Sequence, residues 1–318
     1  MSKSTIYIDG EAGTTGLEIR KRLEGRNDIE ILSIEADKRK DHAARKKRLN
    51  ECDLAILCLP DDAAREAVAL IDNPRTRVLD ASTAFRTDPD WVYGFPELTQ
   101  TQADKIGDAK RVSNPGCYPT GAIALLRPLV DAGAIPASFG VTVNAISGYS
   151  GGGKELIALC ESRTGGDRSA AFCLYGLDQK HKHLPEMKLY SGLHDEPIFL
   201  PSYSSAFYRG MLITIALRLR DLNRITGKLV DDETIHLLLA ERYAGQAHVK
   251  VEPLQRGLEK TYVLTPLAQN ETDNLQLRVF SNEDKETIIL TACLDNLGKG
   301  ASGAAVQNAE LMLGLAAR

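Results

Sequence analysis

The chain has 318 residues, of which 43% are hydrophobic and 26% are charged, and its formal net charge is -4. This length suits two packed domains, and the composition is ordinary for a globular protein. Acidic and basic residues are mixed along the chain and no run of about 18 apolar residues occurs, so we expect neither a nucleic-acid partner nor a membrane span.

The first predicted unit is a strand over residues 5–9, a glycine turn over 10–16 and a helix over 17–23. Such a unit binds phosphate, because glycines let the backbone approach a pyrophosphate and the helix start offers free N–H groups. The spacing is GxxGxxG, which by itself can also mark a simple tight turn. The candidate cofactor contacts here are Gly10, Gly13, Thr14, Thr15 and Gly16. Since the chain enters this strand directly, we expect no signal peptide.

The segment after the second predicted strand, residues 29–34, bears on which dinucleotide is bound. An acid here, Glu35 or Asp37, would accept the ribose hydroxyls of NADH. A base, Lys38 or Arg39, would instead pair with the 2'-phosphate of NADPH, and Lys38 is our candidate contact. The basic stretch that begins at Lys38 holds seven basic residues, and either a solvated helix or a lip around a ligand phosphate would explain it.

The next strands complete the pattern of the first domain. Residues 52–59 are nearly all apolar, as expected for a parallel strand buried on both faces, and residues 77–80 form a further strand. Strands alternate with helices such as the one over 63–71, which predicts an α/β fold with a Rossmann-type doubly wound parallel sheet. Ligands bind beyond the carboxyl ends of such strands, so Ser82 is a candidate cofactor contact.

From about residue 117 the predicted strands become longer and alternate in polarity. This pattern indicates an α+β catalytic domain with a mixed or antiparallel sheet, one face of which is covered by helices. The strands expected here span residues 140–146, 211–219, 249–251, 276–280 and 287–292. A final helix over 308–317 is expected to return to the first domain. We therefore predict a dinucleotide-binding domain from residues 1–116 and 293–318, and a catalytic and dimerisation domain from 117–292.

Cys117 is the residue that we expect to act as a nucleophile. It follows the turn 114–116 and precedes Pro119, which suits the first turn of a helix, so the thiol lies at a helix N-terminus. The partial positive charge there favours the thiolate, which attacks carbonyl carbons. An inert buried thiol is the alternative, and it fits the other five cysteines, which lie in apolar runs without CxxC or disulfide spacing. Reduced thiols predict a cytoplasmic protein.

A thiolate needs a partner for proton transfer, and the segment 181–186 concentrates two histidines and a carboxylate. We expect His181 or His183 to act as an acid or base, and Glu186 to orient a histidine through its second ring nitrogen. A zinc site would need further Cys or His ligands nearby, and none are suitably spaced, so no metal is expected. A polar helix cap is the plainer alternative for this segment.

A second glycine-rich segment, residues 147–154, follows a predicted strand. Its glycines, hydroxyls and lysine could bind phosphate or let a cofactor ring come close, which makes Ser147 and Gly148 candidate cofactor contacts. A flexible loop is equally compatible with this composition.

An anionic substrate would need a guanidinium group, because arginine holds a carboxylate or phosphate with two parallel hydrogen bonds. Arg86, Arg111 and Arg209 lie beside turns and are the candidates. Most arginines are surface residues, which is the alternative for each of them.

Several blocks of sequence together resemble one enzyme family. The stretch Ser-Asn-Pro-Gly-Cys-Tyr-Pro-Thr-Gly, residues 113–121, resembles the active-site signature of the N-acetyl-gamma-glutamyl-phosphate reductases. Further blocks similar to that family span residues 80–86, 93–98, 147–151, 181–186, 209–211 and 295–303. The resemblance covers most of the chain, and the chain length is similar to that of the shorter of the family's two types.

The resemblance implies an enzyme of arginine biosynthesis, related in fold to aspartate-semialdehyde and glyceraldehyde-3-phosphate dehydrogenases. It would use NADPH to reduce N-acetyl-gamma-glutamyl phosphate to N-acetylglutamate semialdehyde through a thioester on Cys117. By the family's pattern His183 is the expected proton-transfer residue, with His181 second. Within the similar blocks we expect Asn114 to contact the substrate and Asn296 the cofactor. A homo-oligomer, either a dimer or a tetramer, is also implied.

One residue departs from the pattern. Glu11 lies in the glycine turn where the family's longer type usually has a small residue, and an acid near a pyrophosphate is unfavourable unless it points away.

Other functions remain open at the level of sequence. The same chemistry could act on aspartyl phosphate, as in an aspartate-semialdehyde dehydrogenase, or on an aminoadipyl phosphate. A regulatory protein that binds NADP without turnover would not need Cys117. A cysteine hydrolase would have no use for the glycine turn.

Overall fold

The computed structural model describes residues 3–162, 171–227, 229–259 and 261–315, and the chain divides into two compact units. Unit 1 comprises Met1–Pro96, Gln100–Pro115 and Ala301–Arg318, and unit 2 comprises Glu97–Thr99 and Gly116–Gly300. We expected the chain to return to the first domain at residue 293, but unit 1 resumes only at Ala301. The physical reason is that residues 293 and 294 are still part of a long strand of unit 2.

Unit 1 is built on a six-stranded parallel sheet with the strand order β2-β1-β3-β4-β6-β5. The chain passes from β1 to β2 on one side and then crosses to β3 on the other, so the predicted doubly wound parallel sheet is confirmed. The strands are β1 (Ser4–Asp9), β2 (Ile29–Leu32), β3 (Leu54–Leu57), β4 (Arg77–Asp80), β5 (Val92–Tyr93) and β6 (Arg111–Ser113).

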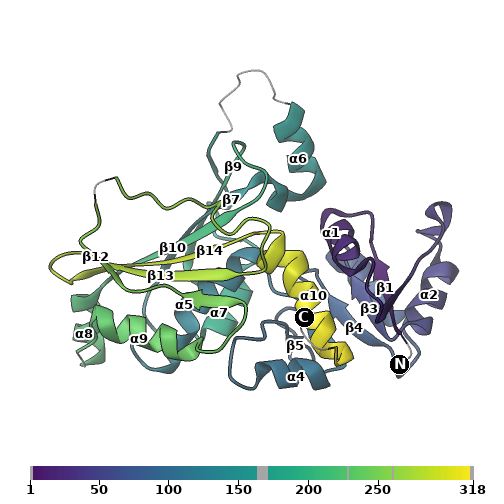
Figure 1. The fold of residues 1–318 in the computed structure, drawn as a ribbon, viewed down its shortest axis with the longest axis horizontal. Coiled ribbons are helices and arrows are strands. Elements are labelled where there is room, and N and C mark those ends of the chain that lie inside the picture. Colours follow the sequence, from purple (N-terminus) through teal and green to yellow (C-terminus); the bar gives the residue numbers. More distant parts are fainter. Residues whose placement is uncertain (1–2, 163–170, 228, 260, 316–318) are drawn as a thin grey trace. The chain divides into compact units, whose positions relative to one another are not determined.

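Helices cover both faces of this sheet, because alternate side chains of each buried strand point to opposite faces. Ile6 and Ile8 of β1 pack in one core with Ile19 of the first helix, whereas Tyr7 packs in a second core with Leu49. Figure 1 shows α2 and α10 on opposite sides of the sheet. The helices are α1 (Thr14–Leu23), α2 (His42–Glu51), α3 (Asp61–Ala69), α4 (Gln102–Asp108) and α10 (Gly303–Leu313), with the short 3-10 turn η1 (Ala36–Lys38).

The last helix, α10, begins five residues before the predicted start at 308. It lies in the core of unit 1 with α1 and α4, as expected for a C-terminal helix that returns to the first domain. Residues 316 and 317, the predicted end of this helix, lie outside the described residues.

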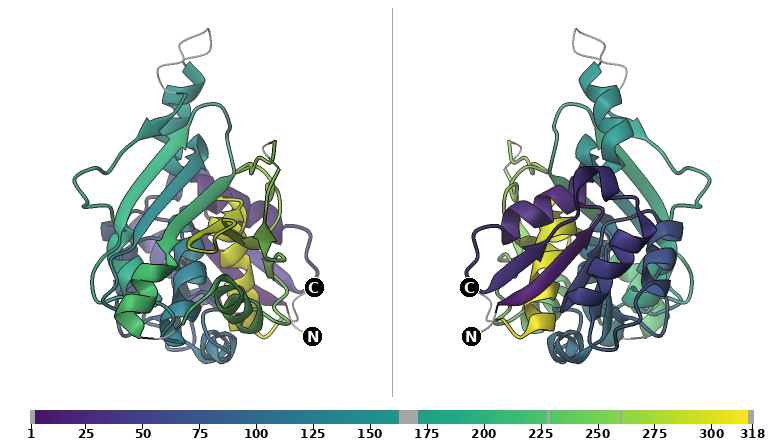
Figure 2. Two further views of the ribbon diagram at one scale, coloured as in Figure 1. Left: turned by 90° about the vertical axis from the view of Figure 1, so that its left-hand side faces the viewer. Right: turned by 90° about the vertical axis from the view of Figure 1, so that its right-hand side faces the viewer.

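Unit 2 contains an eight-stranded sheet in the order β11-β13-β14-β10-β7-β9-β8, with β12 paired to β13. The pairs from β13 through β7 are antiparallel, while β7–β9 and β11–β13 are parallel, so the predicted mixed sheet is confirmed. Figure 2 shows long strands of this sheet side by side in teal to green, the colours of β7, β9 and β10. The strands are β7 (Thr142–Gly148), β8 (Cys173–Leu174), β9 (Ile198–Ser204), β10 (Met211–Arg218), β11 (Val249–Val251), β12 (Gln255–Arg256), β13 (Leu275–Ser281) and β14 (Thr287–Leu294).

One face of this sheet packs against helices. Met211, Ile213, Ile215 and Leu217 of β10 are all buried, with partly exposed residues between them, which is the pattern of a sheet covered on one side. A Cβ on Gly121 of α5 would lie 2.6 Å from Ile213 Cδ1, so α5 crosses the sheet very closely. The helices are α5 (Cys117–Asp131), α6 (Gly153–Ser162), α7 (Leu184–Ser191), α8 (Leu219–Thr226) and α9 (Asp232–Arg242), with the turns η2 (Tyr149–Gly152) and η3 (Gly298–Ser302).

Strand β9 was not predicted from the sequence. Its central Pro201 cannot donate to a ladder and lowers the strand propensity of its neighbours. Nevertheless β9 pairs with both β7 and β8, because tertiary pairing outweighs local preference. None of the described helices is both long enough and apolar enough to cross a membrane.

Candidate active site

The glycine turn after β1 is a place of very close backbone approach. Gly10 has a φ of +88°, and a Cβ there would lie 2.3 Å from the carbonyl oxygen of Cys58. A Cβ on Gly16 would lie 2.5 Å from the carbonyl oxygen of Gly10, so both positions require glycine. Thr14 and Thr15 begin α1, and no side chain among the described residues caps this helix. The N–H groups of its first turn can therefore meet a phosphate.

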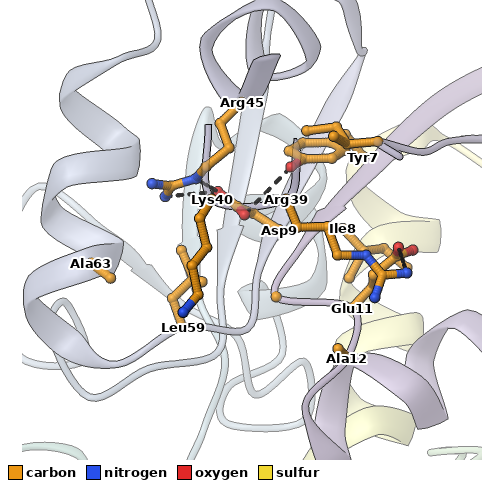
Figure 3. A pocket seen from close by; sticks show the side chains of 12 residues that line it. Tyr7, Ile8, Asp9, Glu11, Ala12, Arg39, Lys40, Arg45, Leu59 and Ala63 are labelled. Carbon is orange, nitrogen blue, oxygen red and sulfur yellow. Dashed lines mark hydrogen bonds and ion pairs between the residues drawn. The ribbon is translucent and has the colours of Figure 1, made fainter. Parts of the chain in front are cut away.

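A cavity of about 390 Å³ lies beside this turn (Figure 3). Its walls combine the apolar side chains of Ile34 and Leu59 with three cations. One of them, Arg45 of α2, is buried and donates from Nε and Nη2 to Asp9 Oδ2 at 3.1 and 3.0 Å. The hydroxyl of Tyr7 donates to the other oxygen of Asp9 at 3.4 Å. Apolar walls beside fixed cations suit the adenosine half of a dinucleotide.

The other two cations of the cavity are Arg39 and Lys40. Arg39 pairs with Glu11 at 2.9 Å, and Arg20 of α1 pairs with the same carboxylate at 2.6 Å. These two pairs neutralise the acid that departs from the family pattern. Of the described residues, Arg39 and Lys40 line the cavity, whereas Lys38, the predicted contact, instead pairs with a glutamate of its own turn at 2.5 Å.

Two predicted contacts of unit 1 lie together. Arg86 is buried and donates from Nε to the backbone carbonyl of Asn114 at 2.9 Å. The side chain of Asn114 accepts a hydrogen bond from Asn308 of α10 at 3.0 Å. Ser82 donates from Oγ to Asp80 Oδ2 at 2.6 Å, so this hydroxyl holds the turn after β4.

The other two candidate arginines lie in different surroundings. The guanidinium of Arg111 lies 5.9 Å from the ring centre of Trp91, and its side chain lines a separate small cavity of about 100 Å³. Arg209, in unit 2, lies with Nε 3.5 Å from the fully buried Asp295. Arg111 is not among the described residues that line the cavity beside the glycine turn.

Cys117 is the first residue of α5, preceded by Gly116 in an extended conformation. The N–H of Gly116 donates to Glu186 Oε1 at 2.8 Å. Glu186 is buried and belongs to α7, which packs along α5. This contact, which the sequence did not predict, fixes the backbone immediately before the thiol.

Gly300 lies against the side chain of Cys117. A Cβ on Gly300 would lie 2.9 Å from Cys117 Cβ, so only glycine leaves room for the cysteine side chain. The neighbouring Lys299 is buried and donates from Nζ to Glu97 Oε1 at 2.7 Å. This buried ion pair anchors the segment that packs against the nucleophile.

His181 and His183 precede α7, with their ring centres 4.8 Å apart. The N–H of His183 donates to Nδ1 of His181 at 3.2 Å, so a neutral His181 carries its proton on Nε2. Burial, helped by the adjacent Lys182, lowers the pKa of His181 to about 4, which keeps this ring neutral near pH 7. The buried His183 ring lies 6.0 Å from the ring of Tyr118, the residue that follows Cys117.

A second cavity, of about 560 Å³, lies in unit 2 and is lined by His181, Lys182, Tyr118 and Tyr175, among others. The hydroxyl of Tyr175 donates to that of Tyr118 at 3.2 Å. Burial raises the pKa of Tyr175 to about 12, so its hydroxyl stays protonated. Sequence reasoning did not single out these two tyrosines; the position of Tyr118 next to Cys117 was the available signal.

The predicted glycine-rich segment is ordered rather than a loop, since β7 runs to Gly148 and η2 and α6 follow it. Ser147 and Gly148 line the second cavity. Asn296 accepts a hydrogen bond from the N–H of Gly210 at 2.8 Å and donates one to Ser150 Oγ at 2.9 Å. Its amide therefore connects this segment to the residue that precedes β10.

Three other cysteines, Cys52, Cys58 and Cys293, lie in surroundings that disfavour the thiolate. Burial raises the pKa of Cys52 and of Cys58 to about 12, and it also raises the pKa of Cys293. Desolvation disfavours the thiolate in each case, so these thiols are poor nucleophiles.

Comparison with known proteins agrees with this division of the chain. A family model described as the semialdehyde dehydrogenase NAD binding domain matches residues 5–106, and one described as the semialdehyde dehydrogenase dimerisation domain matches residues 117–296.

Solved structures share the fold. Aspartate semialdehyde dehydrogenase II from Vibrio cholerae, complexed with ASA, has a TM-score of 0.71 at 15% identity, over 98% of this chain and 99% of that chain. Aspartate semialdehyde dehydrogenase with NADP from Candida albicans has a TM-score of 0.64 at 15% identity, with the same coverage. At such identity the likeness establishes the fold alone.

Curated relatives are much more similar in sequence. N-acetyl-gamma-glutamyl-phosphate reductase from Burkholderia cenocepacia is 51% identical over 315 residues, covering 99% of this chain and 98% of the relative. N-acetyl-gamma-glutamyl-phosphate reductase 2 from Nostoc sp. is 50% identical over 321 residues with the same coverage, and that from Pseudomonas putida is 49% identical. The resemblance found in the sequence is thereby confirmed, and the chain belongs to the N-acetyl-gamma-glutamyl-phosphate reductase family of oxidoreductases.

Proposed function

We propose that the protein catalyses the NADPH-dependent reductive dephosphorylation of N-acetyl-gamma-glutamyl phosphate to N-acetylglutamate semialdehyde, a step of arginine biosynthesis. The observation that carries this proposal is the placement of Cys117 at the start of α5, with Glu186 bound to the preceding N–H and two histidines beside Tyr118. The similarity to reductases of that name along nearly the whole chain supports the choice of substrate. A cytoplasmic homo-oligomer is the expected form, because the six cysteines are free thiols and the second unit matches a dimerisation domain.

The first chemical step belongs to Cys117. Its thiolate, favoured by the positive end of α5, attacks the acyl carbon of the substrate. The backbone N–H of Cys117 stabilises the negative charge that develops on the carbonyl oxygen. The bond from the acyl carbon to the phosphate oxygen then breaks, and a thioester on Cys117 remains.

The histidines divide the proton chemistry. His183 takes the proton of the Cys117 thiol and passes it to the departing phosphate, which leaves as hydrogen phosphate. His181 stays neutral and offers the proton on Nε2 as a hydrogen-bond donor in the cavity. This division agrees with the family pattern, which places His183 first.

The residues of unit 1 fit a dinucleotide. The glycine turn and the start of α1 would hold its pyrophosphate, and Arg39 and Lys40 beside the cavity would meet the charge of a 2'-phosphate. A bound NADPH supplies the hydride that reduces the thioester. Collapse of the tetrahedral thiohemiacetal anion then releases the aldehyde and the Cys117 thiolate, and a proton from solvent returns the thiolate to the thiol.

A comparison of substrates tests the proposal. In the reverse direction we expect phosphate-dependent reduction of NADP+ with N-acetylglutamate semialdehyde and at least a hundredfold lower kcat/KM, about 3 kcal/mol, with aspartate semialdehyde. Equal or greater activity with aspartate semialdehyde would overturn the choice of substrate while leaving the thioester chemistry in place.

A further inference from the structure

Three charged side chains, Glu11, Arg20 and Arg39, form one linked group beside the glycine turn. Glu11, in the glycine turn, is only 13% exposed and contacts Arg20 of α1 at 2.6 Å and Arg39 at 2.9 Å. Figure 3 shows the side chains of Arg39 and Glu11 pointing toward one another, joined by a dashed line. One carboxylate thus serves two guanidinium groups from different parts of the chain.

The two arginines do not have the same access to the cavity. Arg39 lines it and is 46% exposed, whereas Arg20 contacts Glu11 from α1 and also donates to Glu24 and Ser33. Lys40 lines the cavity as well and makes no ion pair with any residue that the structure describes. Arg45, the third cation of the cavity, is bound to Asp9, so Arg39 and Lys40 are the cavity cations that an incoming anion can recruit, whereas Arg20 does not line the cavity.

We propose that Arg20 is a positioning residue for coenzyme choice: it keeps Glu11 compensated, so that Arg39 can leave Glu11 and bind the 2'-phosphate of NADPH. The proposal rests on the proposed function in one respect, namely that NADPH is the coenzyme. It assigns a role to a residue that does not line the cavity.

The physical reason is the cost of leaving a carboxylate with little solvent and no counter-charge. If Arg39 turned to a phosphate and Glu11 had no other partner, that cost would be subtracted from the affinity for NADPH. Because Arg20 remains on Glu11, the transfer of Arg39 costs only one of the two ion pairs of Glu11. That pair is made by a guanidinium whose side chain is 46% exposed, and solvent weakens such a pair. NADH has no 2'-phosphate and leaves Arg39 on Glu11, so its binding does not depend on this exchange.

The test measures dissociation constants of NADPH and NADH for the intact protein without substrate. For Arg39→Met we expect about tenfold weaker binding of NADPH, as for loss of a charge-assisted hydrogen bond, with NADH unchanged. For Arg20→Met we expect a smaller loss, about three- to fivefold, again confined to NADPH. The control is Lys21→Met, which removes one positive charge from the next position of α1, where Lys21 is 69% exposed and pairs with Glu18.

A double variant separates charge compensation from simple damage to α1. Adding Glu11→Gln to Arg20→Met removes the charge that needs compensation, so the affinity for NADPH should return to within about twofold of the wild-type value. The inference is overturned if Arg20→Met binds NADPH like the wild type, if it weakens NADH equally, or if Glu11→Gln does not restore binding. A wild-type protein that binds NADPH no better than NADH would overturn the proposed coenzyme itself, which is a different outcome.

Discussion

Helices in this protein begin in two different ways. Helices α2 and α9 follow Asp41 and Asp231, and each of these carboxylates accepts a backbone N–H of the first turn at 2.7 Å. Helices α1 and α5 follow Gly13 and Gly116, and within the described part of the chain no side chain caps either of them. Neither α1 nor α5 has an acidic residue in its first turn.

Helices α3, α4, α7, α8 and α10 also start without a side-chain cap from any residue that the structure describes, so the missing cap alone does not mark a ligand site. At α1 and α5 it bears on ligand binding because of the residues beside each start. A side-chain cap satisfies the free N–H groups and offsets the positive end of the helix dipole, so it leaves little for a ligand. The starts of α1 and α5 keep that charge, one beside the glycine turn and one beneath Cys117. Their support comes from other elements: close backbone packing at Gly10 and Gly16, and the carboxylate of Glu186.

The largest expected effect is at the start of α5. Cys117→Ser should lower kcat by about a thousandfold or more, because a serine hydroxyl is a far weaker nucleophile near pH 7. The dissociation constant for NADPH and the thermal midpoint should stay close to their wild-type values. Steady-state rates together with coenzyme titration check this, and turnover that is unimpaired in Cys117→Ser would refute Cys117 as the nucleophile.

At the start of α1, even one added methyl group should weaken NADPH binding. Gly16→Ala places a methyl group 2.5 Å from the carbonyl oxygen of Gly10, which the turn can relieve only by moving. We expect at least about tenfold weaker NADPH binding and a loss of about 1–3 kcal/mol in the free energy of unfolding. Gly140→Ala is the control, since a Cβ there meets nothing within 4 Å. Equal behaviour of the two variants would contradict a close approach at the turn.

Glu186 tests how the start of α5 is held. Glu186→Ala removes the acceptor for the N–H of Gly116 and should lower kcat by about ten- to a hundredfold, with the KM for NADPH unchanged. Glu186→Gln keeps a carbonyl acceptor and should recover most of that loss. If the Gln variant is as impaired as the Ala variant, the charge of Glu186 matters more than its contact with Gly116.

His181, which lies near the thiol site, should make the free energy of unfolding depend on pH. Its pKa is lowered from 6.5 to about 4 in the folded chain, so the unfolded chain binds the proton first as the pH falls. The contribution of a neutral His181 to the free energy of unfolding is therefore complete above pH 6.5. It declines as the pH falls below 6.5 and levels off near pH 4. After allowance for partial exposure we expect about 1–2 kcal/mol, measured by denaturant titration at several pH values. His181→Asn should remove this slope; an unchanged slope would assign it elsewhere.

The smallest effect is expected at a capped helix. Asp231→Ala removes the cap of α9 and should cost about 1 kcal/mol of stability, with kcat and NADPH affinity unchanged. Thermal unfolding and steady-state kinetics measure the two parts. A fall in kcat comparable to that of Glu186→Ala would erase the distinction between the two kinds of helix start.

Much of the framework could be predicted because its signals are local. The glycine turn, the buried strands and the helix that begins at Cys117 each depend on a short stretch of residue types with known backbone preferences. The doubly wound sheet and the mixed sheet follow from the periodicity of those stretches. The resemblance of the block around Cys117 then indicated the family, which the relatives confirm.

The contacts that tune the two sites could not be predicted, because they join residues far apart in sequence. Gly116 and Glu186 are separated by 70 positions, and the sequence predicted only that Glu186 would orient a histidine. Lys38 and Arg39 are adjacent and chemically alike, and only the direction of the chain after η1 places Arg39 and Lys40 at the cavity. Strand β9 was not predicted because its proline lowers the local strand propensity, whereas its pairing with two neighbouring strands depends on residues far away in the sequence.

The central claim is that Cys117 carries the acyl group, and omission of the coenzyme tests it most directly. The protein is mixed with N-acetyl-gamma-glutamyl phosphate without NADPH, quenched in acid, and examined for released phosphate and for the mass of the Cys117 peptide. We expect phosphate release of about one equivalent per chain in the first turnover, with an N-acetylglutamyl group on Cys117 and none in Cys117→Ser. Absence of the adduct on Cys117, with phosphate released only when NADPH is present, would contradict the thioester mechanism.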